Sequence, residues 1–170
     1  MKRPEEIIAA SRAAFRSADS RPQMTLRGGD AVDGYREPPD FDPTLDETTD
    51  ENFEKYHWGV TYLDPESWRF YLPILFDYAL RHCSDGSSLV IDALLRSLRP
   101  PEKDPPRFSV LTSDQEKVIV DFLDFLAFSD ESDFKDDAMQ VLEEYWTPNA
   151  LYRPRTEQGG AGNEDHHGDF

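Results

Sequence analysis

The apolar residues of this chain recur mostly at helical spacing, and the alternation with a period of two that indicates β-strands is almost absent. Val118, Phe122 and Phe125, for example, fall on one face of a helix. The pattern predicts an all-α protein of about six helices. The segments with helical patterning are residues 5–18, 50–57, 65–80, 89–98, 113–126 and 134–146.

Polar residues mark where several of these helices begin. Asp64-Pro65-Glu66 combines a cap, a first-turn proline and an acidic first turn, and Thr112 with Gln115 forms a capping box. Pro73 should kink its helix or separate a short turn from the main segment. Residues 107–111 could form a short extended piece.

Two segments lack helical patterning. Residues 19–48 are interrupted by glycine and proline, which predicts either an ordered loop or a mobile acidic connector, with Tyr35 and Phe41 able to fix it to the core. Residues 151–170 are mostly polar and glycine-rich, which predicts a disordered tail. We therefore expect a single helical domain over residues 1–150, followed by this tail.

The composition adds a strong negative charge. The 170-residue chain has 35 acidic and 18 basic residues, for a formal net charge of −17. Nucleic-acid phosphates and anionic membrane surfaces repel a polyanion, so neither is expected as the main ligand.

No segment approaches the ~20 apolar residues of a membrane-spanning helix, and no signal-peptide pattern is present. The single cysteine, Cys83, excludes an internal disulfide. We expect a cytoplasmic protein.

A set of aromatic and apolar groups is spread over about residues 50–147. Its members are Trp68-Arg69-Phe70-Tyr71-Leu72-Pro73, Arg107-Phe108, Leu111-Thr112, Gln115, Val118, Phe122-Leu123, Phe125-Leu126 and Tyr145-Trp146. This set resembles a family of small bacterial proteins catalogued only as a domain of unknown function. The resemblance implies a bacterial, intracellular and mostly helical domain, and it supplies no catalytic residues.

The negative charge is concentrated in two regions. Residues 30–54 contain ten acids and one base, a net −9, and residues 130–144 contain seven acids and one base, a net −6. Acidic patches accelerate association with basic proteins, and neighbouring aromatic side chains can anchor such a complex. The residues that we expect to contact a basic protein partner are Tyr35, Asp40, Asp42, Asp46, Glu47, Asp50, Glu51, Asp133, Asp136 and Asp137.

Candidate catalytic groups are few. Cys83 follows His82, but adjacent helical residues point about 100° apart and do not face each other. His166-His167 lies in the predicted tail, which cannot fix a metal geometry. A calcium loop starting at Asp130 fails because Phe134 occupies a ligand position. We expect no cofactor, no resident metal and no catalytic residue.

Three functions remain open. The first is an acidic protein-binding module, such as an immunity or regulatory protein that neutralises a basic protein partner. The second is a structural or assembly subunit whose charge serves solubility. The third is a metal-assisted hydrolase that uses Asp40, Asp42, Glu54 and His57. The sequence favours the first function through its charge layout and leaves the oligomeric state open.

Overall fold

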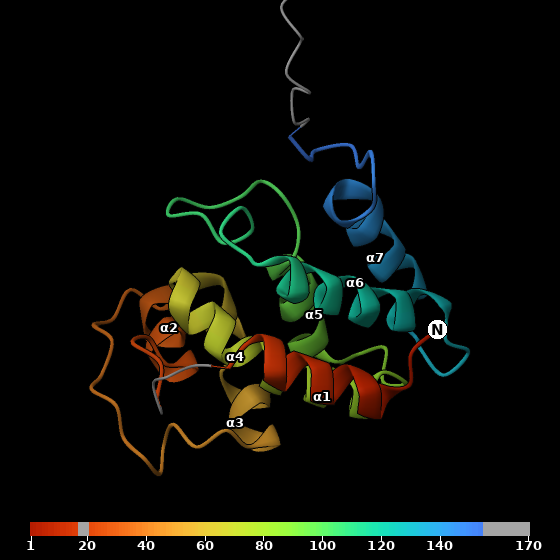
Figure 1. Ribbon diagram of the computed structural model, residues 1–170. Coiled ribbons are helices and arrows are strands. Elements are labelled where there is room, and N and C mark those ends of the chain that lie inside the picture. Colours follow the sequence, from red (N-terminus) through yellow and green to blue (C-terminus); the bar gives the residue numbers. More distant parts are fainter. Residues whose placement is uncertain (17–20, 155–170) are drawn as a thin grey trace, which may run out of the picture.

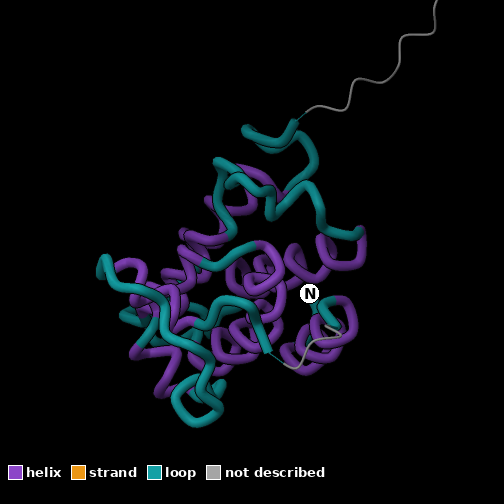
Figure 2. Tube along the Cα trace, turned by 90° about the vertical axis from the view of Figure 1, so that its left-hand side faces the viewer, coloured by secondary structure: helices purple, strands orange, loops and turns teal. Residues whose placement is uncertain are grey.

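The computed structural model describes residues 1–16 and 21–154, and all regular structure in these residues is helical (Figures 1 and 2). Two short elements are not α-helices: η1 is a 3₁₀-helix and η2 is a single π-helical turn. The elements in chain order are α1 (Pro4–Ala14), α2 (Leu26–Asp33), α3 (Asp50–Lys55), η1 (His57–Tyr62), α4 (Pro65–His82), α5 (Leu89–Ser97), α6 (Ser113–Phe128), α7 (Lys135–Val141) and η2 (Leu142–Trp146).

Helix α4 lies at the centre of the core. Its side chains Leu72, Leu75 and Phe76 have no exposed surface. The Phe76 ring stacks on Phe122 of α6 with centroids 4.2 Å apart, and Phe15, which follows α1, meets it edge-on at 6.4 Å. One apolar core therefore joins α1, α4 and α6, which accounts for the neighbouring positions of these helices in Figure 1.

A cluster of aromatic rings closes the other end of this core. Phe108, in the loop after α5, packs on Trp68, Tyr145 and Trp146 with centroid separations of 5.9, 5.0 and 5.2 Å. The Trp146 indole donates a hydrogen bond to the carbonyl oxygen of Leu98 at 2.8 Å. The loop is thereby joined to both α4 and η2, which belong to distant parts of the sequence.

The predicted all-α class is confirmed, and so are several predicted helix starts. The Asp64 carboxylate accepts a hydrogen bond from the Ser67 amide at 2.9 Å. Thr112 and Gln115 bond reciprocally at 3.2 and 3.0 Å, which completes the capping box of α6. The first helix is shorter than predicted because it ends at Ala14, where the buried Phe15 turns into the core. Residues 17–18 of that prediction lie outside the described part.

The prediction of a connector without helix over residues 19–48 is wrong in part. Residues 26–33 form α2, which begins at a Thr25 cap that accepts from the Gly28 amide at 2.8 Å. Its glycines lower intrinsic helix propensity, and this hid the helix from the sequence pattern. Buried contacts compensate, since Leu26, Gly28, Gly29 and Ala31 are all buried. From here on, "connector" means residues 34–49.

Three further expectations need correction. Pro73 does not separate a short turn from α4, which continues through the proline because the buried side chains on both sides hold the helix against the core. Residues 108–111 form a turn closed by a Leu111-to-Phe108 backbone hydrogen bond rather than an extended piece. Residues 151–153 donate backbone hydrogen bonds to residues 143, 144 and 150, so the predicted disorder is wrong for these three residues; residues 155–170 of the predicted tail lie outside the described part.

No helix in residues 1–16 and 21–154 is both long enough and apolar enough to cross a membrane.

Candidate functional site

Helix α2 and η1 pack so closely that their backbones touch. A Cβ atom on Gly29 would lie 2.9 Å from the Gly59 Cα atom and would overlap the Gly59 carbonyl oxygen. A Cβ atom on Gly59 would likewise collide with the Leu26 carbonyl group. The Tyr71 hydroxyl of α4 accepts from the Leu26 amide at 3.3 Å, so the start of α2 is also tied to the core. These contacts fix where the connector leaves α2.

The end of α2 places an aromatic side chain in solvent. The Arg36 amide donates to the Ala31 carbonyl at 2.8 Å and the Tyr35 amide donates to the Val32 carbonyl at 3.0 Å. This pair of bonds is a Schellman motif, whose left-handed position normally holds glycine. Here that position is Tyr35, with φ of 58°, because Gly34 comes one residue too early. The Tyr35 side chain is 100% exposed.

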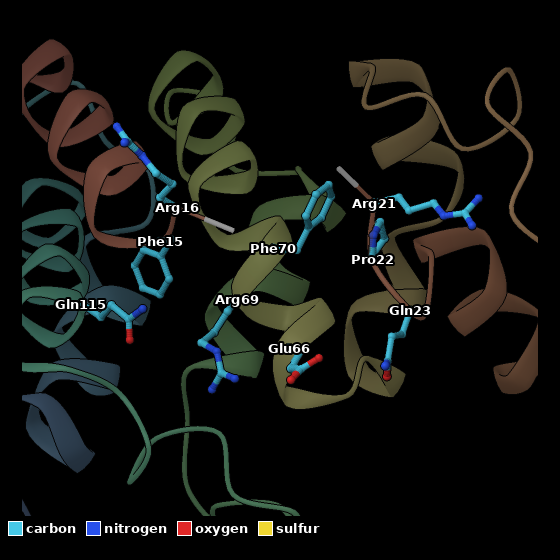
Figure 3. Close-up of a pocket in the computed structure, with 9 residues that line it drawn as sticks. All are labelled: Phe15, Arg16, Arg21, Pro22, Gln23, Glu66, Arg69, Phe70 and Gln115. Carbon is cyan, nitrogen blue, oxygen red and sulfur yellow. The ribbon is translucent and has the colours of Figure 1, made fainter. Parts of the chain in front are cut away.

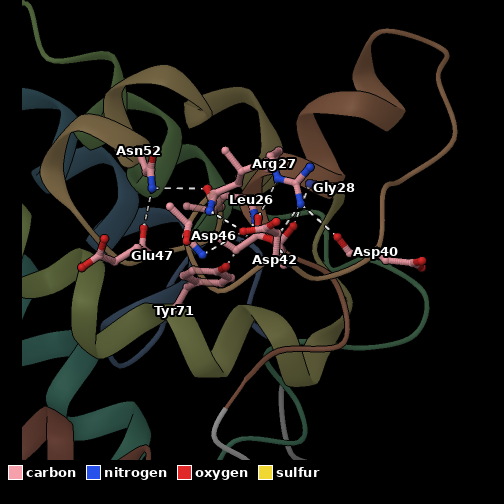
Figure 4. A network of polar contacts seen from close by, with 12 residues as sticks. Leu26, Arg27, Gly28, Asp40, Asp42, Asp46, Glu47, Asn52 and Tyr71 are labelled. Carbon is pink, nitrogen blue, oxygen red and sulfur yellow. Dashed lines mark hydrogen bonds and ion pairs between the residues drawn. The ribbon is translucent and has the colours of Figure 1, made fainter.

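A buried ion pair orders the connector (Figure 4). The Arg27 guanidinium of α2 binds both carboxylate oxygens of Asp46, at 2.9 and 2.8 Å, and also the Asp40 carbonyl oxygen at 2.9 Å. The Asp46 carboxylate has no exposed surface. Burial alone would raise the pKa of Asp46, but the hydrogen bonds from Arg27 and from the Asp42 amide lower it below its usual value. Asp46 therefore holds the connector as an ion.

Further hydrogen bonds shape the connector around this pair. The Asp42 carboxylate accepts from the amides of Thr44 and Leu45 at 2.8 and 3.0 Å, and these bonds lower the pKa of Asp42. The Asn52 side chain of α3 donates to the carbonyl oxygens of Leu45 and Glu47 (Figure 4). The connector is thus an ordered loop held between α2 and α3, which is the first of the two options that its sequence allowed.

Acidic and aromatic side chains remain exposed on this ordered frame. The Tyr62 hydroxyl of η1 donates to the Asp33 carboxylate at 2.9 Å, next to the left-handed turn at Tyr35. The carboxylates of Glu37, Asp40, Glu47 and Glu51 form no hydrogen bond or ion pair within residues 1–16 and 21–154. We define the connector surface by these exposed residues: Asp33, Tyr35, Glu37, Asp40, Glu47, Glu51 and Tyr62.

Asp50 belongs instead to a polar cluster between α3 and α4. Its carboxylate accepts two hydrogen bonds from Arg81, each at 2.8 Å, and lies 3.0 Å from the His82 ring. The bonds from Arg81, followed by those from His82, lower the pKa of Asp50 far below its usual value. Nearby, Tyr78 donates to Glu54 at 2.9 Å, and burial together with this bond raises the pKa of Tyr78 to about 12. The cluster joins α3 to α4.

The second acidic region lies on the other side of the molecule. Figure 1 shows α7 far from α2 and from the connector. Exposed acidic side chains lie near the start of α7, namely Asp133, Asp136 and Asp137. Negative charges interact favourably with the helix dipole at this end of a helix. Glu144 is instead paired with Arg99 at 2.7 Å. The fold therefore brings the expected contact residues together in two separate groups, with those of residues 35–51 in one and those of residues 133–137 in the other.

The side chains considered for metal-assisted hydrolysis do not assemble. The His57 Nδ1 atom lies 2.9 Å from the Glu54 backbone oxygen, while the Glu54 carboxylate points to Tyr78. Asp42 accepts bonds from its own turn. Within residues 1–16 and 21–154, no group of three or more histidine, cysteine, aspartate or glutamate side chains is placed to hold a metal ion.

A cavity of about 220 Å³ lies between the end of α1 and the start of α4 (Figure 3). Arg16, Arg21, Arg69 and Glu66 contribute its charges. Figure 3 shows the Arg16 and Arg21 side chains pointing away from each other. These basic groups therefore do not converge on a common ligand position.

Sequence reasoning did not identify the internal partners of the acidic residues. Asp46 pairs with Arg27, and Asp50 pairs with Arg81 and His82, at separations of 19, 31 and 32 residues. Pairs this far apart leave no local signal in a single sequence. Their effect is that part of the acidic region between residues 30 and 54 is neutralised within the fold.

Comparison with known proteins finds one family whose model matches residues 3–150, described as a family of unknown function (DUF6714). No curated protein and no solved structure matches the chain. The match extends from the start of α1 to beyond η2 and so includes every helix described above. The chain belongs to this family of unknown function.

Proposed function

We propose that this protein is an intracellular protein-binding module that docks a basic protein partner through the connector surface, as an immunity or regulatory protein would. The observation that carries the proposal is Tyr35. It holds a fully exposed aromatic ring on a left-handed backbone, a conformation that costs an L-residue about 1–2 kcal/mol. Exposed tyrosines beside charged groups are common anchors of protein interfaces, and strained residues are frequent at functional sites.

The order of the connector supports the same proposal. A loop fixed by the Arg27–Asp46 pair loses little conformational freedom on binding, and this favours affinity. The exposed carboxylates of Glu37, Asp40 and Glu47 attract a basic partner during encounter. The Asp46 carboxylate supports the loop from inside and offers no surface to a partner. Asp133, Asp136 and Asp137, on the far side of the molecule, are assigned to solubility.

Two variants with equal changes of charge test the proposal. The connector variant carries Glu37→Gln, Asp40→Asn, Glu47→Gln and Glu51→Gln. The control variant carries Glu131→Gln, Asp136→Asn, Asp137→Asn and Glu143→Gln. The full chain is used to capture proteins at low salt from a lysate of its own host, and the captured proteins are identified. Each basic protein among them is then purified, and its binding to the full chain and to the variants is measured by titration calorimetry.

We expect the affinity for the basic partner to fall at least tenfold in the connector variant and to change less than threefold in the control variant. Tyr35→Ala should weaken binding by a similar factor, because it removes an anchor side chain and leaves the charge unchanged. Equal losses in both charge variants would show an effect of net charge alone and would refute the proposal. Failure to capture any basic protein would also refute it.

A further inference from the structure

A cleft of about 270 Å³ lies between η1, α5 and the loop that follows α5. Its local charge is positive, although the net charge of the molecule is negative. All four charged side chains that line it are basic, namely Arg96, Arg99, Lys103 and Arg107. Acids outnumber bases by 35 to 18 in the chain, so a cleft with four bases and no acid runs against the composition. The four residues lie within residues 96–107, a segment that contains only two acids, Glu102 and Asp104, and neither of these lines the cleft.

Arg107 forms the floor of the cleft and is only 2% exposed. Its Nη2 atom donates to the carbonyl oxygens of Val60, Thr61 and Leu63. Its Nε and Nη1 atoms have no hydrogen-bond partner in residues 1–16 and 21–154, and no carboxylate pairs with the side chain there. A buried cation without an anionic partner is costly, so an anion in the cleft would compensate it.

The other three bases stand around this floor. Arg96 pairs with Asp92 at 3.1 Å, and Arg99 pairs with Glu144. Lys103 donates from Nζ to the Thr61 carbonyl oxygen and, like Arg107, meets no carboxylate in the described part of the chain. Two of the four positive charges are thus balanced inside the protein. The two that remain match the charge of a dianion.

We infer that this cleft binds a phosphate group, either inorganic or carried by a small organic molecule. Guanidinium and ammonium groups are the usual protein donors to phosphate oxygens. The volume is slightly below the usual range for drug-sized ligands, which restricts the ligand to a small molecule. Salt screens remote charges over about 8 Å under physiological conditions, so the two unbalanced bases, Lys103 and Arg107, outweigh the distant acids. None of these residues belongs to the connector surface, so this site and the proposed function can fail independently.

Titration calorimetry on the full chain tests the inference. The probes are inorganic phosphate, glycerol phosphate and citrate, each at the same ionic strength set with sodium chloride. We expect the two phosphate compounds to bind and citrate, a larger carboxylate, to bind at least tenfold more weakly. A preference between the two phosphates would identify whether the natural ligand is free phosphate or a phosphate ester.

Exposed residues supply variants that should leave the fold intact. Lys103→Gln should weaken phosphate binding about tenfold, because it removes one of the two unbalanced charges. Lys117→Gln makes the same change at an exposed position on α6 and should leave the affinity unchanged. Absence of binding by both phosphates, equal binding of citrate, or equal effects of the two substitutions would each overturn the inference.

Discussion

At the end of α2 the chain places a tyrosine where a glycine would relieve the backbone. The left-handed φ of Tyr35 is costly for an L-residue, and the exposed ring makes no packing contribution in return. Tyr35→Gly should therefore raise the free energy of unfolding by roughly 0.5–1 kcal/mol, after allowance for the greater freedom of glycine in the unfolded chain. Urea denaturation followed by circular dichroism measures this change.

Tyr35→Ala is the matched control, because alanine also removes the ring but keeps the cost of a positive φ. It should leave the free energy of unfolding within about 0.5 kcal/mol of the original value. If alanine stabilised the protein as much as glycine, the gain would come from loss of the ring and not from relief of the backbone.

A second prediction at the residue scale concerns the Arg27–Asp46 pair. Asp46→Asn leaves the Arg27 guanidinium, whose side chain is 15% exposed, without its counter-charge. Breaking one partner of a buried pair costs about 3 kcal/mol. We expect a loss of that size at pH 7 by urea denaturation. Asp40→Asn is the control, because the Asp40 side chain has no partner in the described residues, and it should change stability by less than about 0.5 kcal/mol.

The same pair makes stability depend on pH in a defined direction. The pKa of Asp46 is lower in the folded protein than its usual 3.8. The stabilisation is therefore complete from about pH 5 upward and is lost as the pH falls through the usual value toward the lower folded-state pKa. Denaturation curves between pH 7 and pH 2.5 should show a smaller loss for Asp46→Asn than for the unchanged protein. Some loss remains, because the pKa of Asp50 is lowered as well. Parallel curves would contradict this account.

At the scale of elements, the contact between α2 and η1 depends on the absence of side chains. Gly29→Ala would place a methyl group against the Gly59 backbone, which cannot move away without separating the two helices. We expect a loss of about 2–3 kcal/mol in the free energy of unfolding. Increased proteolysis of the connector should accompany it, since the connector begins at the end of α2.

Gly86→Ala is the control for this substitution. Its new methyl group would lie 3.3 Å from the Asp133 Cβ atom in an exposed turn. It should change the free energy of unfolding by less than about 1 kcal/mol and leave the proteolysis of the connector unchanged. A similar loss in both variants would mean that the effect reflects glycine replacement in general.

The elements that could be predicted from the sequence are those whose signals are local. The capping box of α6 and the Asp64 cap of α4 lie within a few residues of the helices that they start. Helix α2 could not be predicted, because glycines lower its propensity and its stability comes from η1, about thirty residues away. The uninterrupted course of α4 through Pro73 has the same cause, since packing on α1 and α6 outweighs a local break.

Some residues of the candidate sites could likewise be predicted from the sequence, and others could not. The exposed carboxylates around residues 37–51 and the aromatic Tyr35 could be nominated from composition, because exposure of a charged loop needs no partner. The role of Asp46 could not be predicted from the sequence, since Arg27 approaches it only in the folded chain. The four bases of the cleft around Arg107 lie close together within residues 96–107, but the burial of Arg107 against η1 arises only in the folded chain.

At the scale of the whole molecule, the charge is arranged in three zones. The connector surface and the start of α7 carry exposed acids on opposite sides of the molecule, and the cleft around Arg107 is basic. Internal pairing with basic side chains neutralises the charges of Asp46, Asp50 and Glu144. The proposed protein-binding surface and the proposed anion-binding cleft therefore use different residues.

The net charge of −17 also leads to a prediction for the entire fold. Like charges repel most in the compact state, so screening them should stabilise the folded protein. Raising sodium chloride from about 0.01 to 0.5 M shortens the screening length from roughly 30 Å to roughly 4 Å. We expect the melting temperature to rise by about 2–4 °C, which corresponds to roughly 1 kcal/mol for a protein of this size. Buried pairs such as Arg27–Asp46 are screened far less than exposed charges and should not reverse the sign.

The connector variant and the control variant should both show a smaller rise in melting temperature than the unchanged protein. Each variant replaces four negatively charged side chains by neutral ones, which leaves less repulsion to screen. Calorimetric melting curves at the two salt concentrations make the comparison. A melting temperature that falls with salt would mean that attraction between exposed ion pairs outweighs repulsion. The two charge variants could show equal rises in melting temperature and yet bind the basic partner unequally. That result would separate the general effect of charge on stability from the local use of the connector surface in recognition.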